Sequence, residues 1–166
     1  MAEKLFEGKE QAELERRSRI PPVVAVFDNF LSEGECDHIV SLAQPFFQRA
    51  TVCGSKAGMT SSGRTGSNCW LKHNTDSTTQ SIVTRIAKLL EVPASHSESL
   101  QCIHYDASQQ YRNHYDGWMH DDSEKTQRTL RRGGQRIWTA LCYLNTVAKG
   151  GSTRFTKLKR DVSTMV

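Results

Sequence analysis

Long apolar runs are scarce in this sequence of 166 residues. The longest begins at Pro21 and ends at Phe27, whereas a membrane-spanning helix needs about 20 predominantly apolar residues in succession. We therefore expect no membrane partner. The N-terminal residues MAEKLFEGKE also lack the basic-then-apolar order of a secretory signal, so we expect the protein to be cytoplasmic.

The five cysteines lack the spacing of a disulfide framework or of a structural metal site. Their number is odd, they are well separated, and no Cys-x-x-Cys pair occurs. Such a pattern argues against both a set of disulfide bridges and a zinc site built on cysteine. We interpret these residues as buried or free thiols.

A large excess of one charge is absent as well. Lysine and arginine number 22 against 18 acidic residues, which gives a formal net charge of +4. Acidic residues lie among the basic ones, as at Lys159, Arg160 and Asp161, and this is typical of a solvated surface. We expect no nucleic-acid partner, and the composition leaves the oligomeric state open.

The length suits a single domain. Residues 1–20 are charged and have only a thin apolar stripe, which predicts an N-terminal helical arm ended by the prolines that follow. Residues 21–166 are then the predicted domain. Within it, Val23–Phe27 is rich in β-branched side chains and predicts the first buried strand.

Two helices are predicted in the first half of the chain. Ser32 and Glu35 have the spacing of a capping box, and apolar residues follow at helical spacing until Pro45. Asp76 is the expected N-cap of a second helix that ends before Pro93. The apolar residues of the first helix are Cys36, Ile39, Val40 and Ala43, and those of the second are Ile82, Val83, Ile86, Leu89 and Leu90.

The segment Gly54–Gly66 lies between the two helices. It is small, polar and glycine-rich, so it has few apolar side chains to offset the entropy of ordering it. We predict a mobile loop, which is either a surface connection or a lid over a site.

Short runs rich in β-branched and aromatic residues replace the helical pattern after Pro93, and polar turns separate them. Helices followed by strands favour an α+β fold, in which helices buttress a largely antiparallel sheet or barrel. The predicted strands are Leu100–Tyr105, Tyr111–Tyr115, Arg136–Leu144 and Ser152–Phe155.

A His-x-Asp pair, His114 and Asp116, lies in one of these predicted strands. Residues i and i+2 of a strand point to the same face, so the imidazole and the carboxylate should project together. One histidine and one carboxylate are two of the three ligands of the facial triad that holds non-haem Fe(II). A pair this short also occurs as a surface or structural feature, and the pair alone leaves both interpretations open.

The residues around the pair form an ordered set of motifs. Upstream the chain reads LQCIHYDASQQYRNHYDGW, and downstream it reads GGQRIWTALCYLNTVAKGGSTRF. In these stretches it resembles the catalytic core of the prolyl 4-hydroxylase family of 2-oxoglutarate- and Fe(II)-dependent dioxygenases. Matches in the N-terminal half are looser, and the resemblance covers about residues 23–157. The matching residues are Leu100, Gln101, Tyr105, Tyr111, His114, Asp116, Gly134, Gln135, Arg136, Thr139, Tyr143, Leu144, Asn145, Gly150, Gly151, Thr153 and Phe155.

The resemblance implies a fold, a reaction and a set of cofactors. The fold would be a double-stranded β-helix, or jelly roll, buttressed by the two N-terminal helices, with the site in the barrel mouth. The protein would hydroxylate a prolyl side chain in a peptide or protein, converting 2-oxoglutarate and O₂ to succinate and CO₂. The implied cofactors are Fe(II), 2-oxoglutarate as cosubstrate, and ascorbate.

Site roles follow from the same resemblance. His114 and Asp116 would bind the metal, and Tyr105 and Tyr143 would be catalytic-site residues that contact the cosubstrate or substrate. Thr153 would join them in cosubstrate binding. The alternative for each tyrosine is a packed ring with its hydroxyl bonded to backbone.

Three more residues have two interpretations each. Thr139 could line the pocket or follow ordinary strand preference. Trp118 could wall the substrate groove or pack in the core. Arg64 lies in the loop that closes over the peptide in the family, and a solvated loop arginine is the alternative.

The family has a further iron-binding histidine beyond the Gly-Gly-x-Thr-x-Phe motif, followed by a basic residue for the 5-carboxylate of 2-oxoglutarate. After Asp116 this sequence has only His120, which is too close along the chain to serve. We therefore expect the domain to lack its last core strands. An inactive fragment or a peptide-binding module is the alternative function.

Overall fold

The structure is a computed structural model that describes residues 23–52, 59–118, 126–127, 130–131 and 134–163. Residues 31–166 form one compact unit, and residues 1–30 form another. The predicted N-terminal helical arm, residues 1–20, lies outside the described residues. In the part of the chain that is described, no helix is both long and apolar enough to cross a membrane.

The strand predicted for Val23–Phe27 is wrong. These residues form no strand, and the side chains of Val23, Val26 and Phe27 are exposed. A run of β-branched residues becomes a strand only when a second strand accepts and donates its backbone hydrogen bonds. Within the described residues no strand pairs with this segment.

Helix α2, Glu33–Ala43, begins where the sequence predicts. The Ser32 hydroxyl accepts a hydrogen bond from the Glu35 amide, and the Glu35 carboxylate accepts one from the Ser32 amide at 2.9 Å. This capping box satisfies two of the amides that a helix start leaves without partners. Ile39 and Ala43 are buried, whereas Val40 is exposed. The buried face of the helix is therefore narrower than predicted. The 3₁₀ helix η1, Gln44–Phe46, follows at once.

Helix α3, Ser77–Leu89, also begins at its predicted cap. The Asp76 carboxylate accepts a hydrogen bond from the Thr79 amide at 2.8 Å, and His38 of α2 lies 2.6 Å from its other oxygen. The 3₁₀ helix η2, Ala94–His96, follows Pro93. The buried residues of α3 are Thr79, Ile82, Val83 and Ala87, and Leu89 is exposed at the end of the helix.

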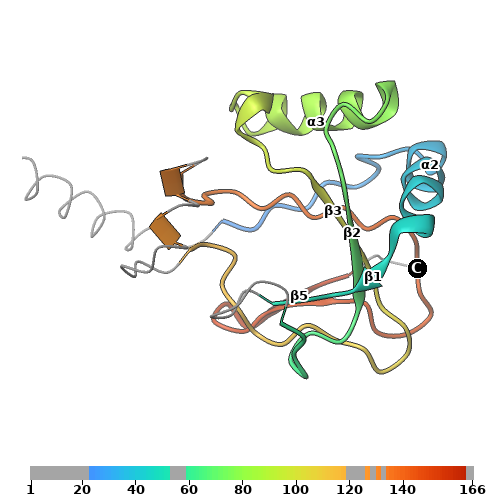
Figure 1. Cartoon of the computed structure of the whole chain (residues 1–166), viewed down its shortest axis with the longest axis vertical. Helices are drawn as coiled ribbons and strands as arrows, with labels where there is room; N and C mark the ends of the chain where they lie inside the picture. The colour runs from blue at the N-terminus through green and yellow to red at the C-terminus, as the bar shows by residue number, and fades with distance from the viewer. Residues whose placement is uncertain (1–22, 53–58, 119–125, 128–129, 132–133, 164–166) are drawn as a thin grey trace, which may run out of the picture. The chain divides into compact units, whose positions relative to one another are not determined.

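A three-stranded antiparallel sheet lies beside the helices, in the order β1-β2-β3. Its strands are β1 (Gln48–Arg49), β2 (Ser67–Leu71) and β3 (Leu100–His104). Strand β3 confirms the prediction for Leu100–Tyr105, while β1 and β2 were not predicted. Helix α2 contacts both α3 and β2 (Figure 1).

The described part of the predicted mobile loop is paired rather than free. Met59 forms a bridge with Val52, and the Ala50 amide donates to the Gly66 carbonyl at 2.9 Å. The Thr65 amide donates to the Gln110 carbonyl at 2.8 Å. Backbone hydrogen bonds therefore order this segment without apolar burial. Residues 53–58 lie outside the described residues.

A separate hairpin pairs β4, Thr153–Phe155, with β5, Arg160–Val162. Strand β4 confirms the prediction for Ser152–Phe155. The strands predicted for Tyr111–Tyr115 and Arg136–Leu144 are wrong, because these segments form no strand ladder in the described structure. The fold is α+β, as predicted, but its described sheets do not by themselves make a jelly roll.

The core joins α2, α3, β2 and β3. Its buried members come from both helices and from the facing sides of the two strands, where Cys69 lies opposite Cys102. The buried cluster is Ile39, Ala43, Cys69, Leu71, Ile82 and Cys102. The described cysteines, Cys36, Cys69, Cys102 and Cys142, are free, which confirms the predicted free thiols at these positions.

Candidate metal centre

The segment that carries His114 and Asp116 leaves the sheet after β3. Two backbone hydrogen bonds fix it to the loop before β2, from Thr65 N to Gln110 O and from Arg112 N to Gly63 O. The structure places the two side chains together, as the sequence predicts, although the segment is not a strand. His114 Nε2 lies 3.2 Å from Asp116 Oδ1.

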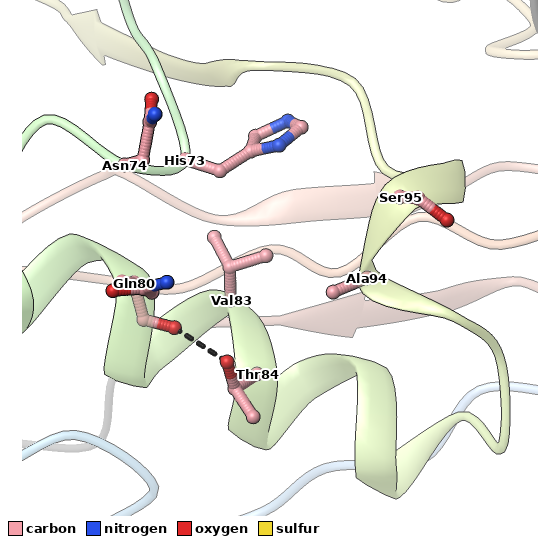
Figure 2. A pocket seen from close by; sticks show the side chains of 7 residues that line it. All are labelled: His73, Asn74, Gln80, Val83, Thr84, Ala94 and Ser95. Carbon is pink, nitrogen blue, oxygen red and sulfur yellow. Dashed lines mark hydrogen bonds between the residues drawn. The ribbon is translucent and has the colours of Figure 1, made fainter.

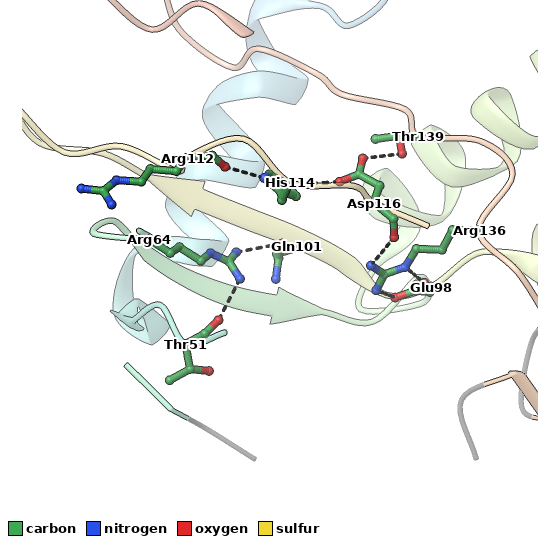
Figure 3. A network of polar contacts seen from close by, with 9 residues as sticks. All are labelled: Thr51, Arg64, Glu98, Gln101, Arg112, His114, Asp116, Arg136 and Thr139. Carbon is green, nitrogen blue, oxygen red and sulfur yellow. Dashed lines mark hydrogen bonds and ion pairs between the residues drawn. The ribbon is translucent and has the colours of Figure 1, made fainter. Parts of the chain in front are cut away.

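The outward atoms of both side chains are already engaged (Figure 3). His114 Nδ1 lies 2.8 Å from the Arg112 carbonyl oxygen. A carbonyl oxygen can only accept, so Nδ1 carries the proton and a neutral imidazole keeps a lone pair on Nε2. The Thr139 hydroxyl donates to Asp116 Oδ2 at 2.7 Å. Nε2 and Oδ1 are left facing one another.

This arrangement favours a cation between the two groups. With the proton on Nδ1, a lone pair of Nε2 faces an anionic oxygen at 3.2 Å, and two electron-rich atoms at that distance repel. A proton or a metal ion placed between them reverses the sign of the interaction. Both side chains are accessible, because His114 is 38% and Asp116 is 47% exposed.

An aromatic stack fixes the plane of the imidazole. The Tyr111 and His114 rings are stacked with centroids 3.6 Å apart, and the Arg64 guanidinium carbon lies 4.7 Å from the centroid of the Tyr111 ring. Arg64 is only 7% exposed, so the solvated interpretation of this arginine is wrong. It donates to the Thr51 carbonyl at 3.0 Å and to Gln101 Oε1 at 3.1 Å. These two acceptors hold its side chain inside the fold.

Arg136 fixes the other side of the site. Its guanidinium donates to both carboxylate oxygens of Glu98, with Nη2 to Oε2 at 2.7 Å, and to the Asp116 carbonyl oxygen at 3.1 Å. The guanidinium carbon also lies 4.6 Å from the centroid of the Trp118 ring. Sequence reasoning assigned no role to Glu98. The two partners are 38 residues apart, so no local pattern could have paired them.

Trp118 is half-buried, and its backbone is held by Gln135. The Gln135 side chain accepts from the Trp118 amide at 2.7 Å and donates to the Trp118 carbonyl at 2.8 Å. The Trp118 ring and the Arg136 guanidinium therefore lie against each other beside Asp116.

The other predicted site residues divide into two places. The Tyr143 hydroxyl donates to the Val162 carbonyl at 2.8 Å and lies 2.9 Å from Thr153 Oγ1, so the structure brings Tyr143 and Thr153 together against β5. This is the backbone-bonded alternative that the sequence left open for Tyr143. Tyr105 is half-exposed, with its ring against Gly66, and burial raises the pKa of its hydroxyl.

Within the described residues, no group of three or more histidine, cysteine or acidic side chains is arranged so that it could hold a metal ion. His120, the other histidine after Asp116, lies outside them. A cavity of about 320 Å³ beside α3 and η2 is a different place, lined by neutral side chains and the imidazole of His73 (Figure 2). It includes neither His114 nor Asp116.

No family model matches the chain, but comparison with known proteins finds similarity to plant prolyl 4-hydroxylases. It is 38% identical over 144 residues to "Probable prolyl 4-hydroxylase 10" of Arabidopsis thaliana, an alignment of 86% of this chain and 48% of the relative. "Probable prolyl 4-hydroxylase 3" of the same plant is 37% identical over 87% of this chain and 49% of its own length. "Prolyl 4-hydroxylase 5", also of Arabidopsis thaliana, is 35% identical over 86% of this chain and 47% of its own length.

This chain is a homologue of the plant prolyl 4-hydroxylases. The chain spans about half the length of the curated relatives it matches. Prolyl 4-hydroxylases are a family of 2-oxoglutarate- and Fe(II)-dependent dioxygenases, so Fe(II) and 2-oxoglutarate are the cofactor and cosubstrate of that family.

Proposed function

We propose that this protein hydroxylates prolyl side chains in a peptide, with His114 and Asp116 as two ligands of Fe(II). The observation that carries the proposal is the 3.2 Å approach of Nε2 to Oδ1, with the opposite atom of each side chain already hydrogen-bonded. A proton on Nε2 or a metal ion between Nε2 and Oδ1 would turn this contact into an attractive one. Homology to proteins named as prolyl 4-hydroxylases supports iron as that cation and proline as the substrate residue.

The residues present fit Fe(II). A neutral imidazole nitrogen and a carboxylate oxygen are the donor types of the non-haem iron site, and the fixed tautomer of His114 directs its lone pair to the carboxylate. When bound with 2-oxoglutarate and O₂, iron would supply the oxidising chemistry that hydroxylates carbon and yields succinate and CO₂. The protein's own part is to hold these ligands in place and to position the peptide.

Tyr105, Tyr143 and Thr153 remain the proposed contacts to the cosubstrate. The Tyr143 hydroxyl can donate its proton to a cosubstrate only after it leaves the Val162 carbonyl, so β5 would compete with the cosubstrate for this hydrogen bond. The Thr153 hydroxyl lies within hydrogen-bond distance of the same Tyr143 hydroxyl, and it would lose this contact when Tyr143 moves.

Further parts of the proposal come from the family resemblance. The complete oxygenase domain would be a jelly roll over the region we assign to residues 21–166, preceded by a helical arm, and ascorbate would maintain the iron as Fe(II). The substrate would be a proline-containing peptide or protein in the cytoplasm. The relatives' names support a proline-containing substrate, and the α+β arrangement supports helices packed beside a sheet.

A peptide-binding module without competent iron is the second candidate. It is favoured because the described residues bring together only two metal-binding side chains at His114 and Asp116. In this case the ligand pair would be a relic, and a proline-rich peptide would bind equally well with and without metal.

Succinate formation tests the proposal against this second candidate. The full chain, loaded anaerobically with Fe(II), would be given 2-oxoglutarate and O₂ with and without a proline-rich peptide. We expect peptide-stimulated succinate formation that His114→Ala abolishes and that His96→Ala, at an exposed histidine of η2, leaves unchanged. Peptide binding without turnover in the wild type, and unaffected by metal, would favour the binding module.

A further inference from the structure

Thr139 touches a candidate metal ligand from a distant part of the chain. It lies 23 residues beyond Asp116, in the segment 136–144, and its hydroxyl donates to Asp116 Oδ2 at 2.7 Å. This is a short hydrogen bond to an anionic acceptor, the type that contributes about twice as much as a neutral one. Figure 3 shows the hydroxyl approaching the carboxylate from the side opposite His114.

The hydrogen bond decides which oxygen of Asp116 is free. A carboxylate can bind a metal ion through one oxygen or through both. Oδ2 is committed to Thr139, while Oδ1 is the oxygen that lies 3.2 Å from His114 Nε2. Rotation of the carboxylate that brought both oxygens to a metal would break the bond from Thr139.

Separate contacts hold the main chain and the side chain of Asp116. Arg136 Nη1 donates to the Asp116 carbonyl oxygen at 3.1 Å and is itself fixed by Glu98, so the backbone does not depend on Thr139. Thr139 is the described donor to the carboxylate itself. Removing its hydroxyl should therefore release the rotation of the carboxylate and leave the backbone in place.

We propose that Thr139 is a positioning residue that holds Asp116 with Oδ1 alone directed to the metal, so that the carboxylate binds through a single oxygen. The inference rests on the proposed function, because it assumes that His114 and Asp116 bind a divalent cation. It adds that a residue outside the His-x-Asp motif sets how many positions of the metal stay open for other ligands.

Metal affinity is the first measurement. Mn(II) would be titrated into the full chain and free Mn(II) followed by electron paramagnetic resonance. We expect Thr139→Val to weaken binding about 10- to 100-fold, the usual effect of losing a hydrogen bond to a metal ligand, and Thr139→Ser to restore it. Thr84→Val removes a hydroxyl that donates to the Gln80 carbonyl on α3, and it should leave the affinity for Mn(II) unchanged. Should the valine variant fail to fold, Thr139→Ala removes the same donor.

A spectroscopic measurement separates positioning from a general structural role. Co(II) bound to the wild type and to Thr139→Val would be compared by visible absorption, whose intensity falls as the coordination number rises. We expect a weaker band in the valine variant, because the released carboxylate supplies its second oxygen. The serine variant should give the wild-type spectrum.

Two results would overturn the inference in distinguishable ways. If the wild type binds Mn(II) and Thr139→Val binds it equally with an unchanged Co(II) spectrum, the role of Thr139 is refuted while the metal site stands. If the wild type binds neither Mn(II) nor Co(II), the proposed function fails, and the inference fails with it.

Discussion

Replacing Arg64 by methionine tests whether its buried charge stabilises the fold. Arg64 is only 7% exposed. Methionine keeps an unbranched apolar side chain at this position and removes the guanidinium. The change leaves the Thr51 carbonyl and Gln101 Oε1 without their donor and removes the cation from the face of Tyr111.

The expected magnitude comes from opposing contributions. Hydrogen bonds to a charged group contribute about 1.5–3 kcal/mol each, and a cation over an aromatic ring contributes about 0.5–2 kcal/mol. Against this, burial of an ion costs several kcal/mol, and Arg64 Nε has no hydrogen-bond partner among the described residues. We expect the two bonds and the ring contact to exceed the cost, so that Arg64→Met lowers the free energy of unfolding by about 2–3 kcal/mol.

Urea unfolding followed by circular dichroism measures this loss. With a slope of about 1–3 kcal/mol per molar urea, the midpoint should fall by about 1 M or more. Arg112→Met is the matched control, because Arg112 is exposed and should change the unfolding free energy by less than about 0.5 kcal/mol. An Arg64→Met protein as stable as the wild type, or more stable, would refute the reasoning by showing that desolvation dominates.

Three further predictions concern packing, pH and thiol reactivity. Gly66→Ala should destabilise the protein by about 1–3 kcal/mol in urea unfolding. Its new Cβ would lie 2.6 Å from the Tyr105 ring, whereas Gly34→Ala meets nothing and should cause no loss. The hydrogen bonds from the Thr79 amide and from His38 lower the pKa of Asp76 below its ordinary value, so its contribution to stability is complete above that ordinary value and is lost as the pH falls through the lowered pKa. Asp76→Asn, which keeps the cap, should remove this part of the pH dependence. Burial raises the pKa of Cys102 to about 12, and iodoacetamide should label it slowly at pH 8 until urea unfolds the chain.

Opposite results would contradict each of these arguments. Equal stability of the Gly66 and Gly34 variants would show that the Tyr105 ring moves aside freely. If the unfolding free energy of Asp76→Asn falls at low pH as steeply as that of the wild type, groups other than Asp76 cause the pH dependence of stability. Rapid labelling of Cys102 in the native chain would show that β2 and β3 separate readily.

Features encoded by neighbouring residues could be predicted from the sequence. Helices α2 and α3 begin at Ser32 and Asp76 because each cap acts within three residues. The approach of His114 to Asp116 was likewise predicted, because the two residues are only two positions apart along the chain.

Features that depend on distant partners could not be predicted in this way. Tyr111–Tyr115 has the composition of a strand, but a strand also needs a paired neighbour. The sequence left two interpretations open for Arg64, because its acceptors lie 13 and 37 residues away, at Thr51 and Gln101. Strand β2 was missed because it follows a glycine-rich stretch, and it is identified by its pairing with β1 and β3.

Oxygen transfer to proline tests the central claim most directly. A proline-rich peptide would be incubated with the Fe(II)-loaded chain, 2-oxoglutarate and O₂, and then analysed by mass spectrometry with fragmentation. The account predicts a gain of one oxygen atom on a prolyl residue with the wild type and none with His114→Ala. A folded, metal-loaded wild type that adds no oxygen, or a His114→Ala variant that still adds it, would contradict the assignment of this pair as the metal centre.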